Sequence, residues 1–113
     1  MDIENAELDV LSSTPDDLLG RVDQLVVEFH RINEPKVLRV MDKLKATFYV
    51  AYVHGNNWSC RWGAPPLPAG ANEILFVNKR LAVLDGTGSG TAPVSPLAAS
   101  NYPELPECQP RWP

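Results

Sequence analysis

The chain has 113 residues, of which 44% are hydrophobic and 21% are charged, and its formal net charge is −4. This composition is typical of a globular protein, and the length suits a single domain. A negative net charge supplies no basic surface for phosphate groups, so we expect no nucleic-acid partner. No apolar run approaches the roughly 20 residues of a membrane-spanning helix, so we expect no membrane partner.

The N-terminal segment and the cysteines indicate the cellular compartment of the chain. The opening segment, MDIENAELDV, contains acidic residues and no basic stretch, so it does not resemble a signal peptide. The two cysteines, Cys60 and Cys108, lack the spacing of metal ligands. We therefore expect a cytoplasmic chain in which both thiols are reduced.

Two short helical patterns open the chain. Apolar residues recur at helical spacing at Ala6, Val10 and Leu11. The segment STPDDLLG then predicts a short helix that ends near Gly20, with Thr14 as its N-cap and Pro15 at its first position.

Strands and one clear helix follow. QLVVEFH (24–30) and ATFYVAYVH (46–54) are apolar runs of the kind found in strands that are covered on both faces. NEILFVNKRLAVL (72–84) predicts a third strand. Between the first two strands, NEPKVLRVMDKLK predicts a helix that begins at Pro35. Its apolar stripe comprises Val37, Leu38, Val40, Met41 and Leu44.

The order of these segments predicts an α/β fold. Strands that alternate with helices favour a parallel sheet with helical crossovers. The connection over residues 55–71 contains no helical pattern, so we expect the last strand to pair antiparallel. From residue 85 onward glycine and proline dominate, which predicts a tail or an extended strap at 85–113 beside a domain at 1–84.

Four segments together carry a family resemblance: DIENAELDVL, QLVVEFH, YVHGNN and PLAASNYPELPE. In this order and spacing they resemble the C-terminal half of FkbM-like S-adenosylmethionine-dependent methyltransferases, in the branch whose penultimate strand ends in His-Gly-Asn-Asn. The resemblance covers residues 1–107. It implies strands four to seven of a Rossmann-like class I methyltransferase sheet, at residues 1–4, 25–29, 48–53 and 74–78, with strand seven inserted antiparallel.

The chain departs from the family pattern in three ways. The family has a glycine where Asn5 stands, and it has an Asp and a Pro where Ala98 and Ser100 stand. No glycine-rich turn precedes residue 1, and GTGSG (86–90) follows the last strand, where it opens no helix. The resemblance therefore implies that the cofactor-binding half is missing here, and that S-adenosylmethionine binds only to the complete protein.

Polar residues follow the predicted parallel strands at their carboxyl ends, the edge at which open α/β sheets bind ligands. We expect seven of them to gather there: Asp2, Glu4, Glu28, His30, His54, Asn56 and Asn57. Methyl transfer to a hydroxyl needs a group that takes its proton, and Asp2 or His54 is the candidate catalytic base. The other five are candidates for binding a small-molecule or sugar hydroxyl substrate.

Each candidate also has a structural interpretation. Asn56 and Asn57 could serve only a turn, His54 could be a core histidine bonded to a backbone carbonyl, and Glu28 could pair with Arg31. These alternatives remain open at the level of the sequence.

Metal and aromatic sites are the remaining options. A metal site from Glu28, His30 and His54 has suitable ligand types but needs close convergence, so we expect no metal. Trp58, Trp62 and Tyr52 could form an aromatic wall for a sugar, although packing is the favoured role.

The sequence thus predicts a fragment of an S-adenosylmethionine-dependent methyltransferase that acts on oxygen in its complete form. The alternative is a non-catalytic interaction module, from a truncated or split gene, that docks through its first strand. The module would associate with another chain or with a second copy of itself, whereas the methyltransferase fragment would associate with the missing N-terminal half.

Overall fold

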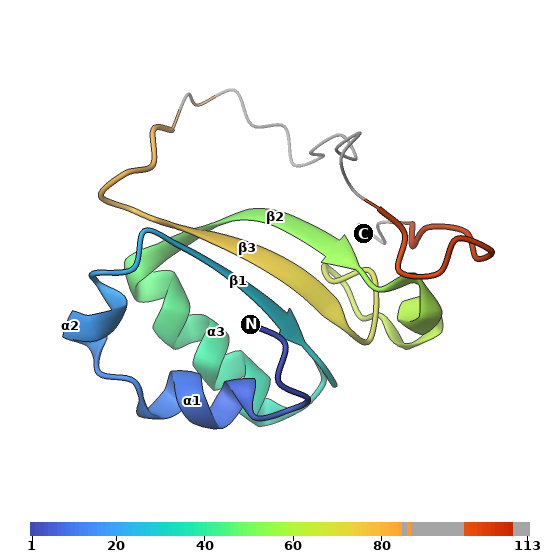
Figure 1. Cartoon of the computed structure of the whole chain (residues 1–113), viewed down its shortest axis with the longest axis horizontal. Coiled ribbons are helices and arrows are strands. Elements are labelled where there is room, and N and C mark those ends of the chain that lie inside the picture. The colour runs from blue at the N-terminus through green and yellow to red at the C-terminus, as the bar shows by residue number, and fades with distance from the viewer. Residues whose placement is uncertain (85, 87–98, 110–113) are drawn as a thin grey trace.

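A computed structural model of the chain describes residues 1–84, 86 and 99–109. Figure 1 shows a small α/β fold with one sheet, as the order of the segments predicts. The elements are α1 (Glu7–Ser13), α2 (Asp16–Leu19), β1 (Gln24–Phe29), α3 (Pro35–Thr47), β2 (Phe48–Gly55), the 3₁₀ helix η1 (Asn57–Trp62) and β3 (Asn72–Asn78).

The sheet has the strand order β1-β3-β2, and β3 runs antiparallel to both neighbours. The predicted antiparallel pairing of the last strand is therefore confirmed. Since both outer strands oppose β3, they point in the same direction, and their carboxyl ends meet at one end of the sheet. β3 ends at Asn78, earlier than predicted, because the Asn78 side chain donates to the carbonyls of Gly20 and Val22 and accepts from the Arg80 amide.

Of the predicted strand at residues 1–4, only Met1 pairs with the sheet. The Met1 amino group donates to the Val26 carbonyl, and the Glu28 amide donates to the Met1 carbonyl over 3.0 Å. This is the hydrogen-bond pattern of a parallel bridge on the outer edge of β1. Glu4 and Asn5, with φ of 54° and 78°, then turn the chain into α1.

The core lies between the helices and one face of the sheet. Helices α1 and α3 pack against each other and against the strands (Figure 1). Phe29, Phe48 and Phe76 project from the three strands into this layer, and the Phe76 ring contacts each of the other two edge to face. The α3 stripe is confirmed at Val37, Val40 and Leu44, but Leu38 is 60% exposed, because α3 faces one sheet and buries only a narrow stripe.

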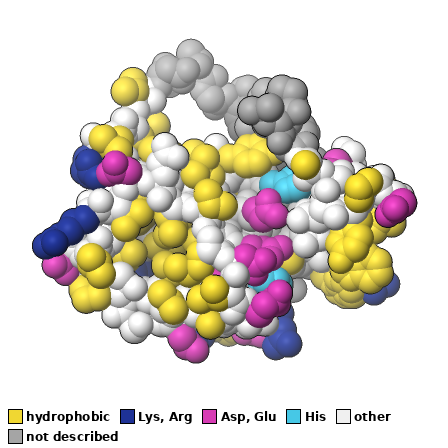
Figure 2. Space-filling model, in the orientation of Figure 1, with side chains coloured by type: hydrophobic (Ala, Val, Ile, Leu, Met, Phe, Trp, Pro, Cys, Tyr) yellow, Lys and Arg dark blue, Asp and Glu magenta, His cyan; other side chains and the backbone are white. Residues whose placement is uncertain are grey.

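The prediction that the strands are covered on both faces is wrong. The second face, which we call the open face, carries no helix in the part of the chain that the structure describes. Val26 on β1 is 51% exposed, and Tyr49 on β2, which pairs with Val77, is also exposed. Figure 2 shows hydrophobic side chains at the surface over the strands.

The helix caps also differ from the prediction. Thr14 is the C-cap of α1, and its hydroxyl donates to the Val10 carbonyl, so it does not cap the next helix. The N-cap of α2 is Pro15, one residue later than expected. No described helix has both the length and the apolar content needed to cross a membrane.

Cys60 and Cys108 form a disulfide that closes 48 residues of sequence. The prediction of reduced thiols is therefore wrong, because spacing along the chain does not reveal that the tail returns to η1. The described tail, 99–109, lies against η1 and the end of β2. Most of GTGSG, together with Ala98, lies outside the described residues.

Candidate functional site

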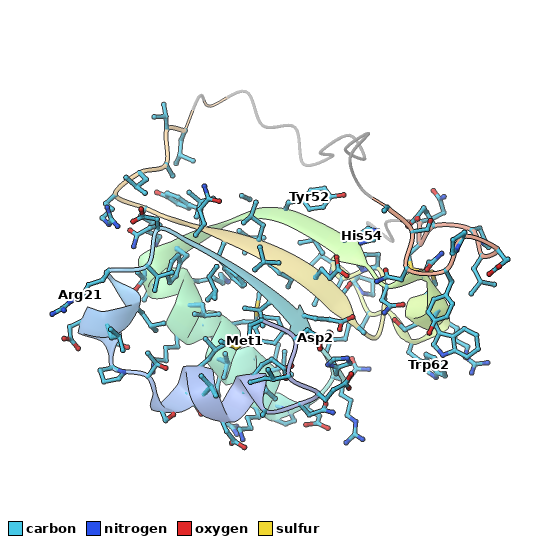
Figure 3. The ribbon with its side chains drawn as sticks, viewed as in Figure 1. Met1, Asp2, Arg21, Tyr52, His54 and Trp62 are labelled. Atoms are coloured by element: carbon cyan, nitrogen blue, oxygen red, sulfur yellow. A yellow bond between two sulfur atoms is a disulfide. The ribbon has the colours of Figure 1, made fainter. Side chains whose placement is uncertain are left out.

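The register of the sheet places one row of polar side chains across the open face. Glu28 of β1 pairs with Glu73 of β3, and Glu73 pairs with His54 of β2. This row lies at the end of the sheet where β1 and β2 finish. Figure 2 shows acidic and histidine side chains gathered there, beside the hydrophobic surface, and Figure 3 shows Asp2 beside the end of β1 and His54 at the end of β2.

Asp2, Glu28 and His30 form the first cluster in this region. One ligand atom from each lies within 4.8 Å of the other two. His30 Nε2 is 3.3 Å from Glu28 Oε2, and Asn56 Nδ2 donates to Glu28 Oε1 over 3.2 Å. Burial raises the pKa of Glu28 above its ordinary value, while the Asn56 hydrogen bond and His30 oppose that shift and Asp2 adds to it.

His54 forms the second cluster with two carboxylates. Its Nδ1 lies 3.3 Å from Glu73 Oε2, and its Nε2 lies 3.2 Å from Glu107 Oε2 in the tail. Ser100 donates to the other oxygen of Glu107. His54 is buried and partnered by side chains, so the alternative of a backbone carbonyl partner does not hold.

The two asparagines have different roles. Asn56 is the N-cap of η1, accepts from the Trp58 amide and also holds Glu28. Asn57 is buried, and its side chain donates to the carbonyls of Tyr102 and Leu105 and accepts from the Tyr102 amide. The side chain of Asn57 is thus occupied in holding the tail. Neither asparagine has a positive φ, so neither serves a left-handed turn.

A hollow of about 620 Å³ opens beside the first cluster. Its lining includes His30, a member of the cluster, and Asn56, which donates to Glu28. Trp58 and Trp62 form part of its wall. The two tryptophans are 60% and 48% exposed, so they are not core residues. The aromatic wall considered from the sequence includes these two, but Tyr52 lies on the strand away from the hollow (Figure 3).

Gly55, at the end of β2, allows the loop before β3 to pack closely against the strand. A Cβ at this position would lie 2.9 Å from side-chain atoms of both Pro68 and Ala69. The loop therefore packs directly on the backbone that separates His54 from Asn56. A larger residue would displace this loop or the end of β2.

Of the seven candidates, four belong to the two clusters, namely Asp2, Glu28, His30 and His54, and a fifth, Asn56, donates to Glu28. Among the described hydrogen bonds, Glu4 has none to either cluster, so the structure does not bring it to the site. Arg31, considered as the partner of Glu28, lies 3.5 Å from Glu34 instead.

Sequence reasoning missed Glu73 and Glu107. Glu73 lies at the amino end of an antiparallel strand, so a rule based on the carboxyl ends of strands passes over it. Glu107 belongs to a tail whose return to the sheet follows from the disulfide and from Asn57. PELPE (103–107) contains two acids, Glu104 and Glu107, and this pair was the sequence signal for Glu107.

Comparison of the chain with protein-family models, curated proteins and solved structures finds no match. The resemblance to FkbM-like methyltransferases therefore remains a prediction from the motifs.

Proposed function

We propose that this chain is the acceptor-binding half of an S-adenosylmethionine-dependent methyltransferase that methylates an oxygen of a small molecule or sugar. The strand order is the observation that supports this proposal best. The resemblance implies strands five, six and seven, with seven inserted antiparallel, and β1, β2 and β3 have that arrangement. A Rossmann-like sheet also has helices on both faces, which accounts for an open face on a half sheet.

Two details near the N-terminus agree with the proposal. Asn5 stands where the family has glycine, and its φ of 78° is a conformation that glycine adopts without strain. Met1 pairs with β1 as a parallel strand would, which suits the end of strand four.

The chemistry requires a proton acceptor. In the transfer, the bond from the methyl carbon to sulfur breaks as a bond to the acceptor oxygen forms, and the hydroxyl proton leaves to a base. Both nitrogens of His54 already face carboxylates, whereas Asp2 is exposed and lies close to His30, which lines the hollow. Asp2 is therefore the favoured base of the two candidates.

Cofactor binding tests the proposed division into halves. Titration calorimetry of the 113-residue chain with S-adenosylmethionine should show no low-micromolar binding, because the glycine-rich turn that would hold the cofactor is missing from its sequence. The DNA upstream of codon 1 should encode a strand, a Gly-x-Gly turn and a helix in frame. Tight binding by the chain alone, or an upstream sequence without that pattern, counts against the proposal.

A second candidate function is the non-catalytic interaction module. The outer edge of β1, which among the described residues is bridged by Met1 alone, and the exposed Val26 and Tyr49 favour it, because such edges and apolar faces pair with other chains. Gel filtration separates the two candidates. The module predicts association of the chain with itself, whereas the methyltransferase half predicts a stable complex with a co-expressed N-terminal half.

A further inference from the structure

We propose that Asp2, Glu28 and His30 form a binding site for one divalent cation, with Mg²⁺ or Mn²⁺ as the best match. Two carboxylates and one imidazole are ligands that Mn²⁺ accepts, and Mg²⁺ takes carboxylates together with water. This ligand set differs from the one considered from the sequence, because Glu73 and Glu107 occupy His54 and Asp2 takes its place.

The spacing of the three groups suits a small cation. Neighbouring ligands of an octahedral cation, with bonds of about 2.1 Å at right angles, lie about 3 Å apart. His30 Nε2 and Glu28 Oε2 are 3.3 Å apart, and all three ligand atoms fall within 4.8 Å. The Glu28–His30 separation is within a few tenths of an ångström of this value, and Asp2, whose side chain is exposed, would rotate toward the other two.

Glu28 is held in place as metal ligands usually are. Its side chain is only 10% exposed, and Asn56 donates to Oε1, which leaves Oε2 directed at His30. A hydrogen-bonded neighbour of this kind orients a ligating carboxylate. Asp2 and Glu28 bring two carboxylates close together, and a cation between them would offset their repulsion.

His30 Nδ1 is buried and has no hydrogen-bond partner among the described residues. Nε2 is the nitrogen that faces Glu28, so Nδ1 needs a separate partner. A ligating histidine usually donates from its second ring nitrogen, and a water bound at Nδ1 would supply that partner.

The hollow gives the cation access to a ligand. His30 lines both the hollow and the cluster, so coordination positions that the protein leaves free would face the space beside Trp58 and Trp62. If the proposed function holds, an acceptor hydroxyl bound there would have a lowered pKa, and Asp2 would act as a metal ligand in place of a base. The cation site itself depends only on the three side chains.

Mn²⁺ alone tests the site by electron paramagnetic resonance on the 113-residue chain. The signal of free Mn²⁺ should fall as protein is added, with one ion bound per chain. Asp2→Asn and Glu28→Gln should each weaken binding at least tenfold, whereas Asp42→Asn, an exposed acid on α3, should leave it within twofold. Thermal unfolding without metal checks that the variants fold, and Asp2→Asn is the safest because Asp2 is exposed.

Nitrogen coupling identifies the histidine. Because the chain has two histidines, the ¹⁴N modulation of bound Mn²⁺ should vanish in His30→Gln and persist in His54→Gln. Unchanged Mn²⁺ binding in Asp2→Asn, or nitrogen coupling that depends on His54, would overturn the inference. Binding of Mn²⁺ by a protein that transfers no methyl group would refute the proposed function and leave the cation site standing.

Discussion

At the scale of single residues, Glu107 makes the tail contact sensitive to acid. The Ser100 hydrogen bond lowers the pKa of Glu107 below its ordinary 4.5, desolvation opposes this, and His54 lowers it further. A carboxyl group with a lowered folded-state pKa stabilises the fold above its unfolded pKa and loses that contribution as the pH falls through the folded pKa. The contact should therefore weaken only below about pH 4.5.

Glu107→Gln tests this assignment. When the pH is lowered from about 5 to about 3, the free energy of unfolding measured with denaturant should fall less in the variant than in the wild type, because the carboxylate that takes up the proton is gone. Glu104→Gln, an exposed acid in the same tail segment, is the control and should follow the wild type. Equal acid sensitivity in Glu107→Gln and the wild type would show that Glu107 does not anchor the tail.

The candidate site was predictable where it depended on strand direction. Glu28, His30 and His54 follow from two apolar runs that end in polar residues. Their partners Glu73 and Glu107 depend on the register of β3 and on the path of the tail, which are set by contacts far apart in sequence.

At the scale of elements, α3 provides a matched pair of leucines. Leu44 is fully buried against the sheet, whereas Leu38, six residues earlier on the same helix, is 60% exposed. Leu44→Ala should lower the free energy of unfolding by about 2–5 kcal/mol, and Leu38→Ala should change it by less than about 0.5 kcal/mol. Chemical denaturation measures both, and equal losses would contradict the packing of α3.

The elements themselves were the most predictable level. Hydrophobic periodicity located α3, β1 and β2 to within two residues, because these segments carry strong local patterns. The coverage of the sheet was not predictable, because Val26 and Tyr49 look the same in the sequence whether or not a second layer covers them. Thr14 was misassigned because a capping residue fits the end of α1 as well as the start of α2.

At the scale of the whole molecule, the disulfide joins the tail to the body. Loop-closure entropy for a separation of 48 residues corresponds to a stabilisation of about 4 kcal/mol at most. Reduction, or Cys60→Ser with Cys108→Ser, should lower the denaturation midpoint and raise amide exchange at residues 100–108. Disulfides persist in oxidising compartments, so this bond argues against the predicted cytoplasmic location. Two free thiols titrated in freshly isolated native protein would contradict the bond.

Methyl transfer tests the central claim most directly. A polypeptide that joins a cofactor-binding half to residues 1–113 should transfer labelled methyl from S-adenosylmethionine to a hydroxyl in a panel of sugars and small alcohols. Asp2→Ala should lower turnover roughly 100-fold to 10,000-fold with the affinity for S-adenosylmethionine nearly unchanged, and Asp42→Ala on α3 should match the wild type. Absence of labelled product from every acceptor, or unchanged turnover in both Asp2→Ala and His54→Ala, would contradict the account.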